Sequence, residues 1–134
     1  MTHKLFKLKI TYSFFYSLFF LFPWCQNFAQ QYNNEMSLIF IGDIMGHGGQ
    51  IKSAYVDSTD SYSYENIFKY IKDEVSDADF TIANLEVTLA GKPYKGYPQF
   101  SSPDALAEAC KNNGIDVFAM ANNHSCDRGK NGII

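Results

Sequence analysis

Histidine, cysteine and clustered basic residues are scarce in this chain, and each scarcity limits what the protein can be. The 134 residues include 3 histidines, 3 cysteines and 1 tryptophan. Once the first 30 residues are set aside, 8 Lys and Arg stand against 14 Asp and Glu, a net charge of -6. An acidic domain without a run of Lys and Arg is a poor candidate for binding nucleic acid, so we expect no nucleic-acid partner.

The chain also lacks an apolar run of membrane-spanning length. ITYSFFYSLFFLF has 13 residues, whereas a transmembrane helix needs about 20. It follows the basic segment MTHKLFKLK, an order typical of a secretory signal peptide. We therefore predict a signal peptide over 1–30, cleaved near Ala29-Gln30, and a linker over 31–35. The mature protein is then exported, as a periplasmic, cell-surface or secreted protein, and contacts a membrane only if the signal segment stays uncleaved.

Two cysteines remain after that cleavage, Cys110 and Cys126. In the layout predicted below, Cys110 lies late in a helix that descends the sheet, and Cys126 lies beyond the top of the next strand. Their Cα atoms should then be farther apart than the roughly 7 Å that a disulfide spans. We predict two free thiols.

Three apolar runs predict three strands, over 36–41, 79–86 and 115–121. The first, MSLIFI, is continuous and rich in β-branched and aromatic residues, which is typical of a strand buried on both faces. Helices are predicted over 65–75, with Ser63 as N-cap, and over 102–114, with Ser102 as N-cap and Gly114 in the left-handed conformation. GDIMGHGGQ is predicted to be a glycine-rich loop. Strands that alternate with helices indicate an α/β fold with a parallel sheet.

Polar side chains follow each predicted strand at the edge where parallel α/β sheets bind ligands. Asp43 and His47 follow the first strand, and Asn84 and Glu86 end the second. The third runs into four more such residues: Asn122, Asn123, His124 and Asp127. We expect these eight side chains to form the walls of one pocket.

These residue types suit a divalent metal ion, because carboxylates, amides and imidazole are ligands of Mg²⁺, Mn²⁺ and Zn²⁺. Such an ion could polarise a phosphoryl oxygen or generate hydroxide, and a histidine beside it could protonate a leaving oxygen. Taken singly, each residue also has a structural interpretation. Asp43 could cap a turn, Asn84 could fix a loop, and His124 could be a structural histidine. Their convergence at three strand ends favours a site.

The motifs GDIM, ANLE and ANNHSCDRGKNG, in this order, resemble the capsule-synthesis protein CapA family, also called poly-γ-glutamate biosynthesis proteins. That family is related to the calcineurin-like metallophosphoesterases. The resemblance covers about residues 36–134. It implies the N-terminal part of a metallophosphatase-like layered sandwich with a largely parallel sheet, and a role in capsule or poly-γ-glutamate-type polymer biosynthesis.

Carried over by position, the resemblance implies that Asp43 is the first metal-site aspartate. Glu86 stands where a second metal-binding aspartate is usual. Asn123 matches a metal ligand and His124 the histidine that acts on phosphate. Asp127, with Gly129, matches a D-x-G that shapes the loop.

Two departures from the metallophosphoesterase pattern stand out. Met45 occupies the position of a usual histidine, and His47, two residues later, becomes the candidate ligand for the same ion. No histidine follows His124, although those enzymes take further histidines from later in the domain. We therefore expect this chain to be the N-terminal portion of a longer protein, with an incomplete sheet.

Three functions stay open. The first is an exported protein of capsule or anionic polymer synthesis, acting beside other envelope polymer-synthesis proteins. The second is a metal-dependent phosphoesterase, a hydrolase of an extracytoplasmic phosphate ester, with Mn, Zn, Fe or Mg as its ion. The third is a non-catalytic protein whose strand-end groups bind an anionic polymer.

Overall fold

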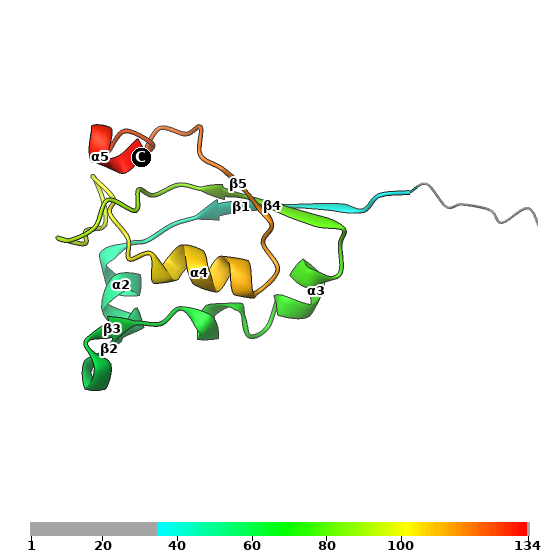
Figure 1. Ribbon diagram of the computed structural model, residues 1–134, viewed down its shortest axis with the longest axis horizontal. Coiled ribbons are helices and arrows are strands. Elements are labelled where there is room, and N and C mark those ends of the chain that lie inside the picture. Colours follow the sequence, from blue (N-terminus) through cyan, green and yellow to red (C-terminus); the bar gives the residue numbers. More distant parts are fainter. Residues whose placement is uncertain (1–34, 134) are drawn as a thin grey trace, which may run out of the picture. The chain divides into compact units, whose positions relative to one another are not determined.

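A computed structural model describes residues 35–133 of the chain as a mixed α/β domain (Figure 1). The predicted signal peptide, its cleavage point and linker residues 31–34 lie outside the described residues. Between residues 35 and 133, no helix combines the length and the apolar character needed to cross a bilayer.

Three strands form the main sheet: β1 (Leu38–Ile44), β4 (Phe80–Leu85) and β5 (Val117–Ala119). Their order is β1-β4-β5, and both pairings are parallel. The predicted α/β class and parallel sheet are thereby confirmed. The strand bounds differ from the prediction at the carboxyl ends, since β1 continues through Asp43 and β5 ends before the polar residues begin.

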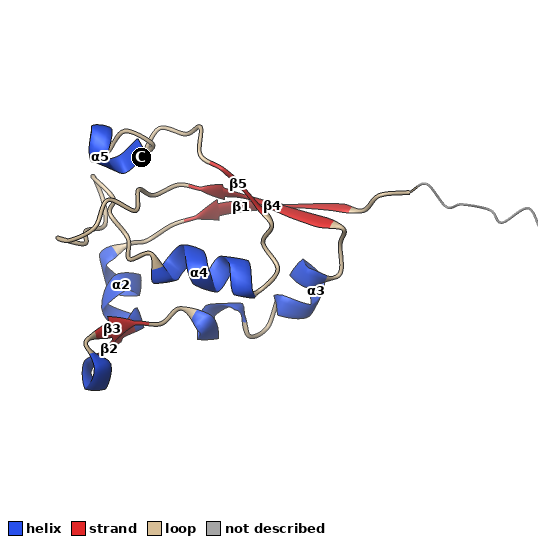
Figure 2. Ribbon diagram, viewed as in Figure 1, coloured by secondary structure: helices blue, strands red, loops and turns tan. Residues whose placement is uncertain are grey.

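One face of the sheet carries the helices α2 (Gly48–Ala54), α3 (Lys72–Ser76) and α4 (Ala105–Asn112) (Figure 2). The hydrophobic core lies between this face and the helices. Ala83 and Leu85 supply it from β4, and Leu106 and Cys110 supply it from α4. Burial of this apolar surface is the main term that holds the helices on the sheet.

The opposite face is open within the described residues, so the expectation of burial on both faces is wrong for β1. Leu38, Phe40, Phe80 and Val117 are 44–72% exposed. Phe40 pairs with Ile82, and Ile82 pairs with Val117, so the register places these side chains in one row. Alternation along each strand sends every second side chain to the face without helices.

The helix predicted over 65–75 is interrupted. The structure has a 3-10 helix η2 (Glu65–Phe68) followed by the short helix α3, and Tyr64, not Ser63, is the N-cap of η2. One helical face of that predicted helix would carry Ile67, Phe68, Ile71 and Val75. Of these, Phe68 and Val75 are buried, whereas Ile67 and Ile71 are 56% and 45% exposed.

The other predicted helix and the predicted glycine-rich loop are also confirmed only in part. Gly114 has φ of 96° and ends α4 as predicted, but α4 begins after Asp104, and Ser102 donates its backbone N–H to Thr88 O instead of capping. The last three residues of the predicted glycine-rich loop, 48–50, are the start of α2, and its first three belong to β1. The sequence prediction missed a small hairpin, β2 (Tyr55–Val56) and β3 (Ser61–Tyr62), joined by η1 (Asp57–Thr59). The final segment GKNGII has the pattern of a helix start, and α5 (Lys130–Ile133) lies there.

The two cysteines are free, as predicted. Cys110 is fully buried on α4, while Cys126 is exposed in the loop after β5. Burial raises the pKa of the Cys110 thiol to about 11, because the interior disfavours the charged thiolate.

Candidate functional site

A bulge in β1 sets the direction of Asp43. Ile41 pairs with Ala83, but Asp43 pairs with Asn84, so Gly42 is an extra residue in the ladder. Regular alternation would have placed Asp43 on the same face as Ile41, toward the helices. The extra residue turns it to the face of Asn84, which is how bulges commonly redirect functional side chains.

Asn84 joins the two carboxylates of the site. Its Nδ2 donates to Asp43 Oδ1 at 2.8 Å and to Glu86 Oε2 at 2.9 Å. Asn84 lies in β4 and Glu86, two residues later, directly follows the strand in extended continuation, so they share a face, and the bulge adds Asp43 to it. Two carboxylate oxygens therefore converge on one amide nitrogen at the carboxyl end of the sheet.

Asn122 fixes the orientation of that amide. Its Oδ1 accepts the backbone N–H of His124 at 3.0 Å, so its Nδ2 must face β4. There Nδ2 donates to Leu85 O and to Asn84 Oδ1, each at 3.0 Å. With Asn84 Oδ1 engaged in this way, only the Asn84 amino group is left to face the carboxylates. The donors thus run in one direction, from the loop after β5 to Asp43 and Glu86.

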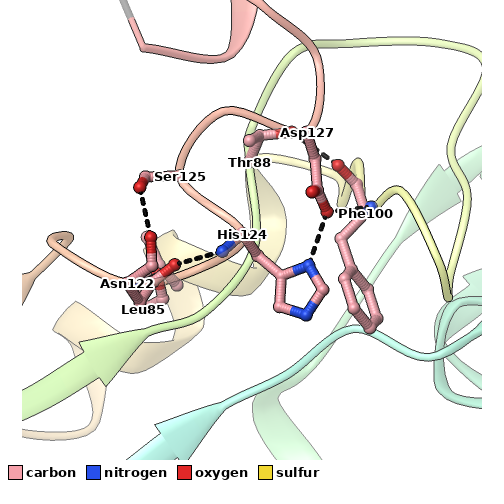
Figure 3. Close-up of polar contacts among 7 residues, drawn as sticks. All are labelled: Leu85, Thr88, Phe100, Asn122, His124, Ser125 and Asp127. Carbon is pink, nitrogen blue, oxygen red and sulfur yellow. Dashed lines mark hydrogen bonds and ion pairs between the residues drawn. The ribbon is translucent and has the colours of Figure 1, made fainter.

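His124 and Asp127 form a pair within the same loop (Figure 3). His124 Nδ1 lies 2.8 Å from Asp127 Oδ2, and that oxygen also accepts the backbone N–H of Phe100 at 2.7 Å. An ionised carboxylate only accepts hydrogen bonds, so Nδ1 carries the proton. Nε2 is then the ring atom available to a ligand, and Figure 3 shows it on the side of the ring away from Asp127.

The ring of Phe100 holds this histidine in place. It contacts His124 edge to face at 4.7 Å between centroids, and His47 in the same way at 5.1 Å. The Phe100 backbone is fixed as well, because its carbonyl oxygen accepts a hydrogen bond from Thr88 Oγ1 at 2.6 Å. Phe100 is fully buried. Sequence reasoning missed it, since it stands in a turn-rich segment that looks like a surface excursion.

The predicted site residues thus fall into two groups. Asp43, Asn84, Glu86 and Asn122 form one hydrogen-bonded network, which the backbone N–H of His124 extends to the pair with Asp127. His47 contacts Phe100, and its backbone N–H donates to Gln50 Oε1 at the start of α2. Asn123 is exposed beside the network. Within residues 35–133, no three or more His, Cys, Asp or Glu side chains are grouped so as to hold a metal ion.

Comparison with known proteins places this arrangement in a family. The family described as "Bacterial capsule synthesis protein PGA_cap" matches residues 37–134. The chain belongs to this capsule synthesis family. The resemblance drawn from GDIM, ANLE and ANNH is thereby confirmed, because these motifs all lie inside the matched residues.

A curated relative supports the same assignment. The chain is similar to the "Capsule biosynthesis protein CapA" of Bacillus anthracis, with 24% identity over 106 residues, covering 75% of this chain. The match covers 25% of that relative. The chain therefore spans about a quarter of the length of this capsule synthesis protein. Asp43, Glu86 and His124 all belong to the part that carries the family's pattern.

Proposed function

We propose that this chain is exported and acts in the synthesis of a capsule or a poly-γ-glutamate-type polymer, with a divalent metal ion at the carboxyl ends of β1 and β4. Membership of the capsule synthesis family supports the polymer role. The basic and apolar order of the first 22 residues supports export. The single observation that carries the metal site is the convergence of Asp43 and Glu86 on Asn84 Nδ2.

The residues present fit a hard divalent ion. Asp43 and Glu86 present two carboxylates to one amide nitrogen, and we assign a further oxygen donor to Asn123, which is exposed in the loop after β5. Mg²⁺ and Mn²⁺ accept oxygen ligands, and Mg²⁺ usually keeps several waters with only one or two carboxylates. When bound, such an ion would neutralise the carboxylates and polarise a phosphate or carboxylate oxygen of the substrate.

The proposed role of His124 is to move a proton at Nε2. Asp127 holds the proton on Nδ1, so neutral His124 accepts at Nε2 and protonated His124 donates there. The side chains of His124 and Asp127 are 14% and 12% exposed, so the ring is sheltered but still reachable. A leaving oxygen at Nε2 would receive its proton from the imidazolium form of this ring.

Specific observations favour each of the two other functions. The His124–Asp127 pair beside two carboxylates favours a metal-dependent phosphoesterase acting on an extracytoplasmic phosphate ester. The lack of a group of three or more His, Cys, Asp or Glu ligands in the described part of the chain favours a non-catalytic protein that binds polymer. Both are compatible with a place beside envelope polymer-synthesis proteins.

The test is the metal content of the full chain and of two matched variants, Asp43→Asn and Asp77→Asn. Each variant loses one carboxylate, but Asp77 lies at the end of α3, away from the network. We expect bound Mn, Zn, Fe or Mg in the unmodified chain and in Asp77→Asn, and its loss in Asp43→Asn. A folded chain that takes up no ion from a divalent-ion solution, or equal metal in both variants, would overturn the metal site.

A second measurement addresses His124. We expect hydrolysis of p-nitrophenyl phosphate, if the chain catalyses it, to fall by about 10²–10⁴-fold in His124→Ala, the usual contribution of a general acid. Turnover that is unchanged in this variant would remove His124 from the reaction. No hydrolysis by a metal-loaded chain would leave polymer binding as the function.

A further inference from the structure

The charges of this acidic domain are unevenly distributed. Segments 87–103 and 117–133 together hold four of the eight cationic residues that follow residue 34, but only one of the fourteen acidic residues, Asp127. The four cations are Lys92, Lys95, Arg128 and Lys130. The remaining parts of 35–133 combine four cations with thirteen carboxylates.

The two segments lie against each other in the fold although the 13 residues 104–116 separate them in the sequence. Arg128 Nη1 donates to Pro93 O at 3.3 Å, and the Phe100 N–H donates to Asp127. Gly132 in α5 lies so close to Thr88 that a Cβ on it would be 2.8 Å from Thr88 Cγ2. Figure 1 shows both segments together with α5 beyond the carboxyl ends of the strands.

The loop that carries Lys92 and Lys95 is held in position on its other side. Lys95 and Ser101 exchange both backbone hydrogen bonds, at 2.8 and 2.9 Å, which closes the loop. Gly96 packs on the start of α2, because a Cβ there would be 2.5 Å from Gly48 N. Lys95 therefore projects from an anchored loop and not from a free chain.

Asp127, the sole carboxylate of these two segments, is already engaged in hydrogen bonds within the domain. Asp127 accepts from both His124 Nδ1 and the Phe100 N–H. The acidic residues gather elsewhere, and many lie at the amino ends of the strands: Asp73, Glu74, Asp77, Asp79 and Asp116. Carboxylates are thus numerous at the amino ends of the strands, whereas four cations lie in the two segments that follow β4 and include the loop after β5.

We propose that Lys92, Lys95, Arg128 and Lys130 form a cationic rim that receives an extended polymer with repeated carboxylate or phosphate groups. This rests on the proposed function, since the segments that carry these cations follow the strand ends at which the site is proposed. Cations of one sign around a site raise the local concentration of anions and their association rate. The rim also counters the repulsion that Asp43 and Glu86 exert on an acidic polymer, and the acidic opposite end turns the polymer away.

The experiment measures the association rate of a fluorescently labelled glutamate polymer with the full 134-residue chain in EDTA, so that no metal is needed. The variants are Lys92→Gln/Lys95→Gln and, as a control with the same charge change, Lys69→Gln/Lys111→Gln. All four lysines are exposed. We expect the rim variant to associate ~10-fold more slowly at low salt and the control less than about 2-fold. The difference should vanish near 1 M salt, where the Debye length is about 3 Å.

Inorganic polyphosphate and neutral dextran complete the test. Binding of polyphosphate with the same rim dependence assigns the rim to phosphate as well as carboxylate polymers, and dextran is expected not to bind. Equal slowing by both variants, equal binding of dextran, or no binding of either polyanion would overturn the rim. Because EDTA is present, these results are independent of the metal site. If Asp43→Asn loses its metal while the rim variant still associates more slowly, the metal site and the rim are supported independently.

Discussion

Replacing Asn122 by aspartate should be the most damaging isosteric change in the strand-end network. The amide Nδ2 of Asn122 donates to Leu85 O and to Asn84 Oδ1, each at 3.0 Å, from a partly buried position. A carboxylate cannot donate, so Asn122→Asp loses two hydrogen bonds and turns a negative oxygen toward two acceptors.

The expected loss follows from these contacts. Each hydrogen bond contributes about 1 kcal/mol net, and acceptors left unpaired away from water add to the cost, so the free energy of unfolding should fall by about 2–4 kcal/mol. That is a large part of the ~5–15 kcal/mol of a typical domain. Asn84 can relieve the clash only by turning its amino group to the introduced carboxylate, which would aim its own Oδ1 at Asp43 and Glu86.

The assay is urea unfolding of the full chain, with Asn123→Asp as the control. Asn123 is the adjacent residue and is exposed, so the same change of charge there should alter the free energy of unfolding by no more than about 0.5 kcal/mol. If both variants unfold at the same urea concentration, the orientation of the Asn84 and Asn122 amides does not stabilise the fold and the reasoning is refuted.

Three further outcomes are expected. Cys126 should react with iodoacetamide at mildly alkaline pH, while Cys110 should react only on unfolding. Burial removes Cys110 from solvent and raises its pKa to about 11. Peptide mapping measures the labelling of each cysteine, and equal labelling of the two would contradict this expectation. Two asparagine amides lower the pKa of Glu65 below its ordinary 4.5. The unmodified chain should therefore be more stable than Glu65→Gln above pH 4.5, and this difference should disappear as the pH falls through the lowered pKa. Unfolding of both proteins at several pH values measures it. Gly114→Ala should destabilise by more than about 1 kcal/mol, because φ is positive and the Cβ would lie 2.5 Å from Ser76 Oγ; Gly42→Ala, with no atom within 4 Å of the added Cβ, serves as its control in thermal unfolding.

The α/β class and the parallel sheet were predictable because apolar runs that alternate with helical segments are local signals. MSLIFI and FTIANLE are rich in β-branched and aromatic residues, which favours strands, and a parallel sheet brings their carboxyl ends to one edge. The burial of β1 was not predictable in the same way. Phe40 is 72% exposed because no described element covers its face of the sheet. Whether an element covers a face depends on segments outside the strand, so the strand's own residues do not predict it.

The short elements escaped prediction for a different reason. β2 and β3 have two residues each, too few for any hydrophobic period to show. The interruption after Phe68 also conflicts with a regular helical pattern over 65–75. There, tertiary contacts of Phe68 and Val75 with the core prevail over the continuous pattern of Ile67 and Ile71.

Within the site, residue types were predictable and their relations were not. Asp43 was expected after the first strand, but only the bulge at Gly42 turns it toward Asn84. Asp127 was expected to shape its loop; it also accepts from His124. Phe100 could not be found from sequence, because its contacts with His47 and His124 join segments far apart in the chain.

The oxygen that Phe100 and His124 share makes one backbone amide a reporter of what binds the histidine. Asp127 Oδ2 accepts from both the Phe100 N–H and His124 Nδ1. A cation that binds the opposite ring nitrogen, Nε2, polarises the imidazole, so Nδ1–H draws more electron density from that oxygen and the oxygen holds the Phe100 N–H less strongly. The nitrogen and proton resonances of this single buried amide should therefore shift when a ligand binds Nε2, although the ligand does not contact Phe100.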